Sequence, residues 1–303
     1  MSTSLYAAEL PPPLAGDVDQ CWRRLQRFLD EGESRVITGV QARAVAERLW
    51  RRISEHPYGA RPEADPRVSA ALATLYWFRV RAAGTSGDVE EQRSLALFRC
   101  LARLGDGKVV PPGPRRRLDE EDEENGQAEQ LNDIAVQLLA EYAANRSRGA
   151  LQESISVLRQ AAGHAKPGTP VLARLQTNLA GALLTLYKTE QRRDIIRDAL
   201  TSGGRAVANE LTFGVDRAAA LSNYATVLVF AAGVPGLVER PALRAAVDHA
   251  RGARRSLGPA SPLDSSYTDT VISVARVVFE RTGEWHDLQV ALALAEQRRP
   301  RWV

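Results

Sequence analysis

The sequence predicts an all-α protein in which similar pairs of helices are stacked along the chain. The first observation is a repeated register. The helical pattern around Asn178 recurs 45 residues later around Asn223 and 45 residues earlier around Asp133, and a weaker copy starts at Thr270. The second observation is that apolar residues recur at intervals of three and four, whereas no alternating run is long enough for a strand. Self-similarity at a period of roughly 20–50 residues is typical of stacked-repeat architectures.

The composition is that of an ordinary globular protein, with 44% hydrophobic and 25% charged residues. Only three of the 40 basic residues are lysines (Lys108, Lys166 and Lys188), so arginine dominates. Arginine binds phosphate well, but acidic residues leave a net charge of only +3. We therefore expect the arginines to lie on solvated helix faces and nucleic acid not to be the partner.

The sequence shows no pattern of a disulfide framework, a signal peptide or a membrane span. Cys21 and Cys100 are too few for a disulfide framework and lack metal-ligand spacing. The first residues lack the pattern of a signal peptide, and no stretch approaches the ~20 apolar residues of a membrane span. We expect a cytoplasmic protein that has no membrane contact, metal or cofactor.

The N-terminal part is predicted to consist of a disordered leader over residues 1–16 and a helical region over residues 17–104. Three consecutive prolines, which lack backbone donors, end at Pro13 and indicate the leader. Pro66 suits the first turn of a helix, and Asp88 is a good N-cap residue. Apolar spacing predicts helices starting at Asp17, over 40–54, from Pro66 through Val80, and from Asp88 through Leu101.

Residues 105–127 interrupt the helical pattern. They combine Gly and Pro residues with three arginines at 115–117 and a wholly acidic run at 119–124. Adjacent blocks of opposite charge without apolar anchors are typical of solvated connectors. We expect a charged linker loop that separates the N-terminal helical region from the main array at 128–303.

The array contains four predicted pairs, each with a first helix (helix A) and a second helix (helix B). Ala180 and Ala225 lie one position after the apolar stripe of helix A and are small, which predicts close contact between A and B. Gly203 and Gly204 are expected to allow close helix packing. The predicted A helices span 128–143, 171–187, 216–232 and 265–281, and the B helices span 149–162, 193–208, 241–257 and 285–298.

The register Asn178-Leu179-Ala180 and Asn223-Tyr224-Ala225 resembles tetratricopeptide (TPR) repeats. The longer period, a linker such as 167–170, a turn such as 281–284 and the segment 72–98 are similar to the expanded repeats that precede the caspase-like domain of bacterial CHAT-domain proteins. The resemblance covers most of residues 40–299. It implies a right-handed α–α superhelical solenoid that acts as a recognition or regulatory array, with a caspase-like protease as an expected partner.

One departure from peptide-binding TPR domains concerns their carboxylate clamp. Many of these domains carry an asparagine three residues after the Asn178 position. This chain has Val136, Gly181, Thr226 and Ser273 there. We therefore do not expect capture of a C-terminal carboxylate by that clamp.

Candidate catalytic residues are sparse. Both cysteines lie among apolar residues and are expected to pack as small hydrophobes, although a Cys–His pair across distant helices remains a minor alternative. The four histidines (His56, His164, His249 and His286) show no ligand or catalytic spacing. Four tryptophans (Trp22, Trp50, Trp77 and Trp285) are expected in the core, whereas Trp302 could dock onto a partner if it is exposed.

These patterns predict a non-enzymatic scaffold or sensor that binds a protein or peptide partner in a groove lined by the A helices. Asn178 and Asn223 have an alternative structural role, in which they bond to neighbouring backbone. Two other functions stay open, a helical-repeat nucleic-acid binder with arginines along the groove and an all-α enzyme with a dispersed active site. The candidate groove residues are Arg174, Thr177, Asn178, Arg217, Ser222, Asn223 and Thr226.

Overall fold

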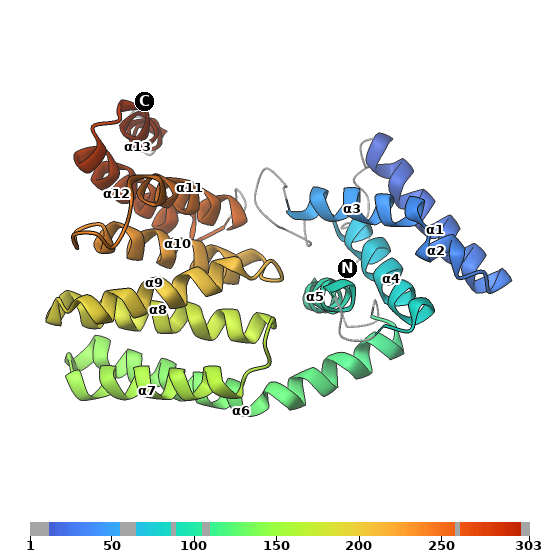
Figure 1. Cartoon of the computed structure of the whole chain (residues 1–303), viewed down its shortest axis with the longest axis horizontal. Coiled ribbons are helices and arrows are strands. Elements are labelled where there is room, and N and C mark those ends of the chain that lie inside the picture. Colours follow the sequence, from blue (N-terminus) through green and yellow to red (C-terminus); the bar gives the residue numbers. More distant parts are fainter. Residues whose placement is uncertain (1–11, 55–64, 86–88, 105–109, 258–260, 298–303) are drawn as a thin grey trace. The chain divides into compact units, whose positions relative to one another are not determined.

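The structure is a computed structural model that describes residues 12–54, 65–85, 89–104, 110–257 and 261–297. Within these ranges the chain forms thirteen α-helices and no strand (Figure 1). The all-α prediction is confirmed. The chain divides into two compact units, Met1–Glu123 and Glu124–Val303, and the boundary falls inside helix α6 (Pro112–Asn145).

The N-terminal unit is built around helix α4 (Pro66–Ala83), which packs against its neighbours α1, α2, α3 and α5. A helix that is apolar around most of its circumference has to be buried on several sides. Helix α4 meets this requirement because its buried residues, among them Leu72, Ala73 and Leu75, point in different directions around the axis. The surrounding helices are α1 (Pro12–Glu31), α2 (Arg35–Thr38), α3 (Val40–Ser54) and α5 (Val89–Leu104).

The disordered leader predicted at 1–16 is wrong for residues 12–16, which already belong to α1. Prolines without a backbone donor are tolerated in the first turn of a helix, because the amide groups of that turn have no partner inside the helix. Residues 1–11 lie outside the described residues.

The charged linker loop predicted at 105–127 is also wrong from Pro112 onward, because these residues form the first half of α6. The opposite charges pair with each other and with α5. Arg117 bonds Glu120 at 3.1 Å, and Arg99 of α5 bonds Asp122 at 2.7 Å. Pairs spaced three or four residues apart support a helix. The buried positions also recur at helical spacing, at Leu118, Glu121, Asn125 and Ala128.

The C-terminal unit contains the last part of α6 and seven further helices. All eight predicted helices of the array are confirmed, with ends that differ from the prediction by a few residues except where α6 starts earlier. The helices are α7 (Arg148–His164), α8 (Pro170–Glu190), α9 (Arg193–Ala208), α10 (Gly214–Ala231), α11 (Arg240–Leu257), α12 (Asp264–Thr282) and α13 (Trp285–Gln297).

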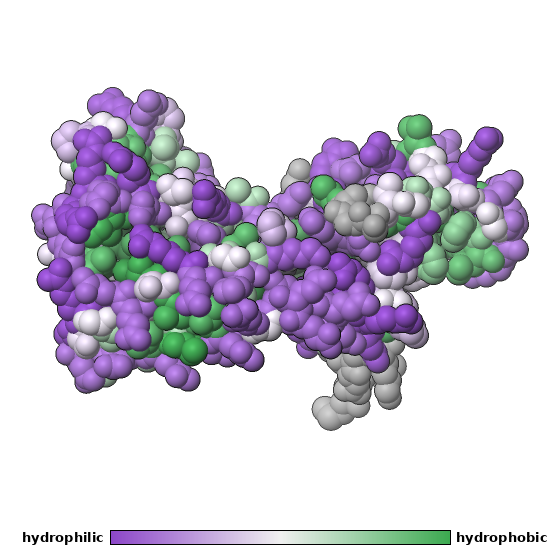
Figure 2. All heavy atoms as spheres, turned by 60° about the horizontal axis from the view of Figure 1, so that its bottom comes forward, coloured by the Kyte–Doolittle hydropathy of each residue, from purple (hydrophilic) through white to green (hydrophobic). Residues whose placement is uncertain are grey.

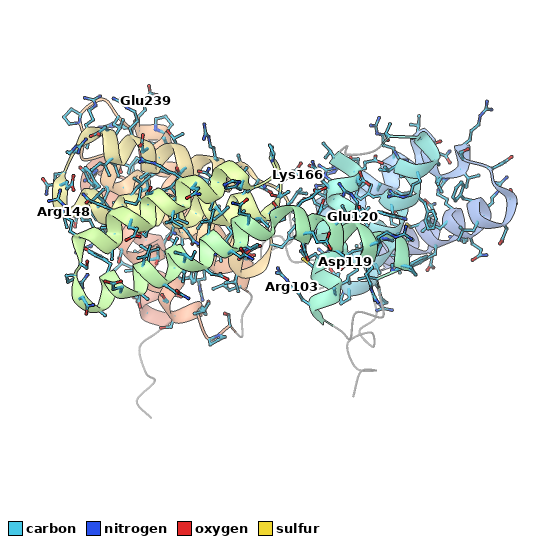
Figure 3. All side chains as sticks on the ribbon, turned by 90° about the horizontal axis from the view of Figure 1, so that it is seen from below. Arg103, Asp119, Glu120, Arg148, Lys166 and Glu239 are labelled. Atoms are coloured by element: carbon cyan, nitrogen blue, oxygen red, sulfur yellow. The ribbon has the colours of Figure 1, made fainter. Side chains whose placement is uncertain are left out.

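Packing in this unit follows the order of the sequence. Each of the A helices α8, α10 and α12 packs against the B helix before it and the B helix after it, and consecutive A helices also contact one another. Contact restricted to neighbouring pairs is the pattern of stacked repeats. Ala180 and Ala225 are fully buried, as their small size predicted. Ion pairs lie near both ends of α7, between Arg148 and Glu190 and between Lys166 and Glu124. Figure 3 labels Arg148 and Lys166, which lie near opposite ends of this helix.

The tryptophan prediction is half right. Trp50 and Trp77 are buried, whereas Trp22 is 43% exposed and Trp285 is 57% exposed. Trp285 begins α13, the last described helix, whose main packing partner among the described helices is α12. Its ring rests edge-on against Phe279 at a centroid distance of 6.0 Å, so one face stays open. Trp302 lies outside the described residues.

Candidate binding hollow on the A helices

Consecutive A helices are linked by side chains that recur at the repeat period. The Asn178 Nδ2 of α8 donates to Oδ1 of Asn132 in α6 at 2.8 Å, and the Asn223 Nδ2 of α10 donates to the carbonyl of Thr177 in α8 at 3.3 Å. Arg174 of α8 forms an ion pair with Glu129 of α6. The two asparagines that define the repeated register therefore link α8 to α6 and α10 to α8.

An open hollow of about 530 Å³ lies over these links, on the side of α6, α8 and α10 where the two asparagine side chains meet the surface. Three of its twelve lining residues are Gly or Ala. A β-carbon on Gly181 would lie 3.3 Å from the Asn223 Nδ2, so glycine keeps room for the amide. The lining residues are Leu139, Tyr142, Ala143, Arg146, Asn178, Gly181, Ala182, Leu184, Thr185, Lys188, Asn223 and Thr226.

Two cations mark one end of the hollow. The guanidinium of Arg146 lies 5.7 Å from the ring centroid of Tyr142, and the ammonium of Lys188 lies 4.9 Å from that of Phe230. Within the described residues neither cation has a carboxylate partner. Arg146 follows the last residue of α6 with φ of 55°, a left-handed conformation common just beyond helix ends. An incoming anion would meet two unneutralised charges beside aromatic rings.

Three of the seven sequence-predicted residues line this hollow, namely Asn178, Asn223 and Thr226. Thr226 bonds the carbonyl of half-buried Ser222 at 2.9 Å. Thr177 is buried, and its hydroxyl donates to the carbonyl of Ala173. Arg174 is held by Glu129, as described above.

Arg217 has a structural role at the end of a neighbouring helix. Its Nη1 donates to the carbonyl of Val207 at 2.6 Å and to that of Asn209 at 3.2 Å, at the C-terminal end of α9. A cation there satisfies carbonyl groups that have no partner inside the helix. Burial also lowers the pKa of the Arg217 guanidinium. The Arg217 side chain is therefore occupied by hydrogen bonds inside the C-terminal unit.

Sequence reasoning missed Tyr142, Arg146 and Lys188. It concentrated on polar positions in the first half and the middle of helix A, whereas the hollow extends to the last turn of α6 and α8. A signal was present in the register, because Tyr142 and Tyr187 occupy equivalent positions and Lys188 follows the second of them. The left-handed backbone conformation of Arg146, which lines the hollow, had no signal in the sequence.

A second, smaller hollow of about 340 Å³ lies between α7, α8 and α9. Its rim carries the ion pair of Arg159 with Asp198 at 2.8 Å, and Arg205 lies nearby. Gln176 contributes a buried Oε1 that has no hydrogen-bond partner.

Catalytic and metal-binding arrangements receive little support from the described residues. Burial raises the pKa of the Cys21 thiol to about 12, and its Sγ donates to the carbonyl of Ala71. Such a thiol is a poor nucleophile. No three His, Cys, Asp or Glu side chains among the described residues come together to hold a metal ion. His56 lies outside the described residues.

None of the described helices combines the length and the apolar composition that a membrane-spanning helix needs. Comparison of the chain with protein-family models, with curated proteins and with solved structures finds no match in any of the three.

Proposed function

We propose that the protein is a non-enzymatic interaction scaffold or sensor, built as a right-handed solenoid of TPR-like repeats, whose A-helix hollow receives a segment of a partner protein. The observation that carries the proposal is the open hollow over α6, α8 and α10 with its two unpaired cations, Arg146 and Lys188. In keeping with the sequence resemblance, the partner is expected to be a cytoplasmic protein of a CHAT-type, caspase-like protease system.

The hollow suits a peptide better than an enclosed small molecule. Its volume of about 530 Å³ lies within the usual range of ligand sites, but its walls are open to solvent. Small lining residues such as Gly181 and Ala182 let a peptide backbone come close. On the face of the C-terminal unit shown in Figure 2, hydrophobic residues gather in patches among hydrophilic ones. Such a surface fits an extended or helical segment with alternating contacts.

Charge specifies the segment further. Arg146 and Lys188 favour an internal Asp or Glu side chain, which would pair with both cations beside Tyr142. This mode differs from the TPR carboxylate clamp, because Gly181 and Thr226 stand where that clamp needs asparagine. An enzymatic function has weaker support, because the hollow is open and Cys21 is buried with a raised pKa.

Selection of a displayed random-peptide library on the purified chain tests the proposal. Enriched peptides should share an acidic residue flanked by apolar ones, and the best of them would be measured by fluorescence anisotropy. Charge reversal by Arg146→Glu and Lys188→Glu should weaken binding at least tenfold for each variant. Arg276→Glu removes an exposed cation of α12 outside the hollow and should leave the affinity unchanged.

Two results would refute the proposal. One is that no peptide is enriched above background. The other is that the two reversals in the hollow and Arg276→Glu weaken binding equally, which would mean that overall charge and not the hollow attracts the peptide. Circular dichroism and thermal melting of each variant establish that the fold is retained.

A further inference from the structure

Charge is distributed unevenly between the two kinds of helix in the C-terminal unit. The B helices α7, α9 and α11 carry ten arginines and four acidic residues, a net charge of +6. The A helices α8, α10 and α12 carry five basic and five acidic residues, so their net charge is zero. Among these six helices the net positive charge therefore lies on α7, α9 and α11, whereas the last B helix, α13, carries two acidic residues and no Lys or Arg.

Helix α11 presents its arginines as a stripe. Arg240, Arg244, Arg251 and Arg255 are all exposed. At about 100° per residue, their spacing keeps all four within about 60° of one another around the helix. With a rise of about 1.5 Å per residue, the stripe is about 22 Å long. This length matches several phosphate groups along a nucleic-acid strand.

The B helix of the preceding repeat also carries exposed arginines. Arg193 and Arg197 lie one turn apart on α9, and Arg205 is near its end; all three are exposed. The ion pair of Arg159 in α7 with Asp198 in α9 shows that these two B helices lie side by side. We call the exposed arginines of α9 and α11 the B-helix basic surface.

Most of these guanidinium groups are not neutralised inside the protein. Arg244 pairs with Glu284, but six other arginines of this surface have no carboxylate partner among the described residues. They are Arg193, Arg197, Arg205, Arg240, Arg251 and Arg255. Six unpaired cations of one chemical type on two adjacent repeats favour an anionic ligand with regularly spaced charges.

The residue composition of the B-helix basic surface favours a nucleic acid over a protein as its ligand. Protein interfaces usually centre on buried apolar and aromatic residues. None of the exposed large hydrophobic residues lies on α9 or α11, and neither helix contains Phe, Tyr or Trp. Without aromatic platforms, unstacked bases of a single strand have nothing to stack on. Guanidinium groups match phosphate oxygens in a bidentate geometry.

We propose that the B-helix basic surface binds the phosphate backbone of a nucleic-acid duplex without sequence specificity. This surface lies on B helices, whereas the hollow is lined by A helices. The proposal for the basic surface does not depend on the proposal for the hollow. It also differs from the nucleic-acid alternative raised by the sequence, which placed the arginines along the groove. DNA and RNA duplexes offer the same phosphate chemistry, so separate measurements distinguish these two sources.

The test is fluorescence anisotropy with 30-base-pair DNA and RNA duplexes of several unrelated sequences, at several salt concentrations. If about five phosphates are contacted, the logarithm of affinity should fall with a slope of about −4.5 against the logarithm of salt concentration. This slope corresponds to a loss of about 500-fold between 50 and 200 mM salt. All sequences of one duplex type should bind equally within about threefold.

Variants locate the surface. The double reversal Arg251→Glu with Arg255→Glu should weaken duplex binding at least 30-fold, and the milder Arg251→Gln with Arg255→Gln should weaken it less and lower the salt slope by about 2. The control Arg276→Glu on α12, and Arg146→Glu in the hollow, should bind duplex as the unchanged protein does. Retained peptide binding by the α11 variants keeps the outcome separate from that for the hollow.

Three results would overturn the inference. The first is no duplex binding at 50 mM salt, and the second is binding that the α11 reversals leave unchanged while they keep the native melting temperature. The third is a polyglutamate chain that binds as tightly as the duplexes, which would assign the surface to an acidic protein. If the Arg→Glu reversals fail to fold, the Arg→Gln pair decides through its salt slope.

Discussion

A β-carbon placed on Gly203 of α9 would lie 2.7 Å from Cδ2 of Tyr224 on α10. This distance is shorter than carbon atoms accept without movement, and the obstacle is a partly buried ring that also packs against His249 at 5.3 Å. The ring cannot swing away without giving up that contact. Gly203 therefore sets how closely a B helix approaches the A helix of the next repeat.

We expect Gly203→Ala to lower the free energy of unfolding by about 1–3 kcal/mol, because overpacking shifts side chains or backbone. The adjacent Gly204→Ala is the matched control. Its β-carbon would lie 3.7 Å from Oη of Tyr224, which is an ordinary contact. Since alanine favours helix by up to ~1 kcal/mol over glycine, the control should be neutral or stabilising. Urea denaturation measures both, and equal effects would contradict the packing argument.

The hydrogen bond of Asn178 with Asn132 should contribute measurable coupling between α8 and α6. Either single change to alanine leaves a partner amide without its bond, at a cost of about 1–2 kcal/mol. The double variant should cost less than the sum of the two single variants, with an interaction energy of about 0.5–1.5 kcal/mol. A double-mutant cycle from urea denaturation gives this value. If the effects of the two single changes simply added in the double variant, the hydrogen bond between Asn178 and Asn132 would not stabilise the unit.

The N-terminal unit depends on an ion pair that is largely removed from solvent. Arg79 of α4 bonds both carboxylate oxygens of Glu90 in α5, at 2.8 and 3.0 Å, and also bonds the carbonyl of Ile37. Glu90→Ala leaves the buried guanidinium without its counter-charge and should lower the free energy of unfolding by about 3 kcal/mol.

The control for that variant is Glu31→Ala, which removes the carboxylate of the solvent-exposed pair with Arg27. Surface pairs of this kind contribute little. Thermal melting of the two variants should therefore show a clear fall for Glu90→Ala and a change within error for Glu31→Ala. Similar melting temperatures would show that the pair is dispensable.

His249 should make the stability of the C-terminal unit depend on pH. Burial, and secondarily the charge of Arg217, lower the pKa of His249 below its usual 6.5, whereas the adjacent Asp248 acts in the opposite direction. The unfolded chain then takes up a proton at a higher pH than the folded chain does. The contribution of neutral His249 to the free energy of unfolding is complete above a pH of about 6.5. It is lost as the pH falls through the pKa of His249 in the folded state.

Unfolding free energies measured between pH 8 and pH 5 on the unchanged protein and on His249→Gln test this sign. The variant should show a weaker decline toward pH 5, whereas His164→Gln, which changes an exposed residue at the end of α7, should keep the full decline. A decline that is identical in His249→Gln would assign the effect to other groups.

Helix positions in the array followed from local information. The apolar stripe of helix A, the proline at the start of α8 and the glycine after α12 each act within a few residues, so the periodicity indicated where α7 to α13 lie. Ala180, Ala225 and Gly203 were also interpretable, because small side chains at fixed positions have few explanations other than close packing.

Two features could not be predicted because they depend on partners distant in the sequence. The charged segment at 115–124 looked solvated, yet Arg99 of α5 supplies the opposite charge that holds part of it in a helix. In the hollow, Arg146 and Lys188 are 42 positions apart and come together only when α6 packs beside α8. The sequence identified polar positions by residue type. It does not show which of these side chains already bond to other residues of the protein.

The uninterrupted course of α6 across the border at Glu123 and Glu124 affects how the protein can be taken apart. A fragment that begins at residue 128, where the repeats were expected to start, would cut a continuous helix and remove Glu124 and Asn125, which bond Lys166. Expression of the second half alone should therefore start at Pro112, so that the whole helix is kept and its natural first turn is preserved.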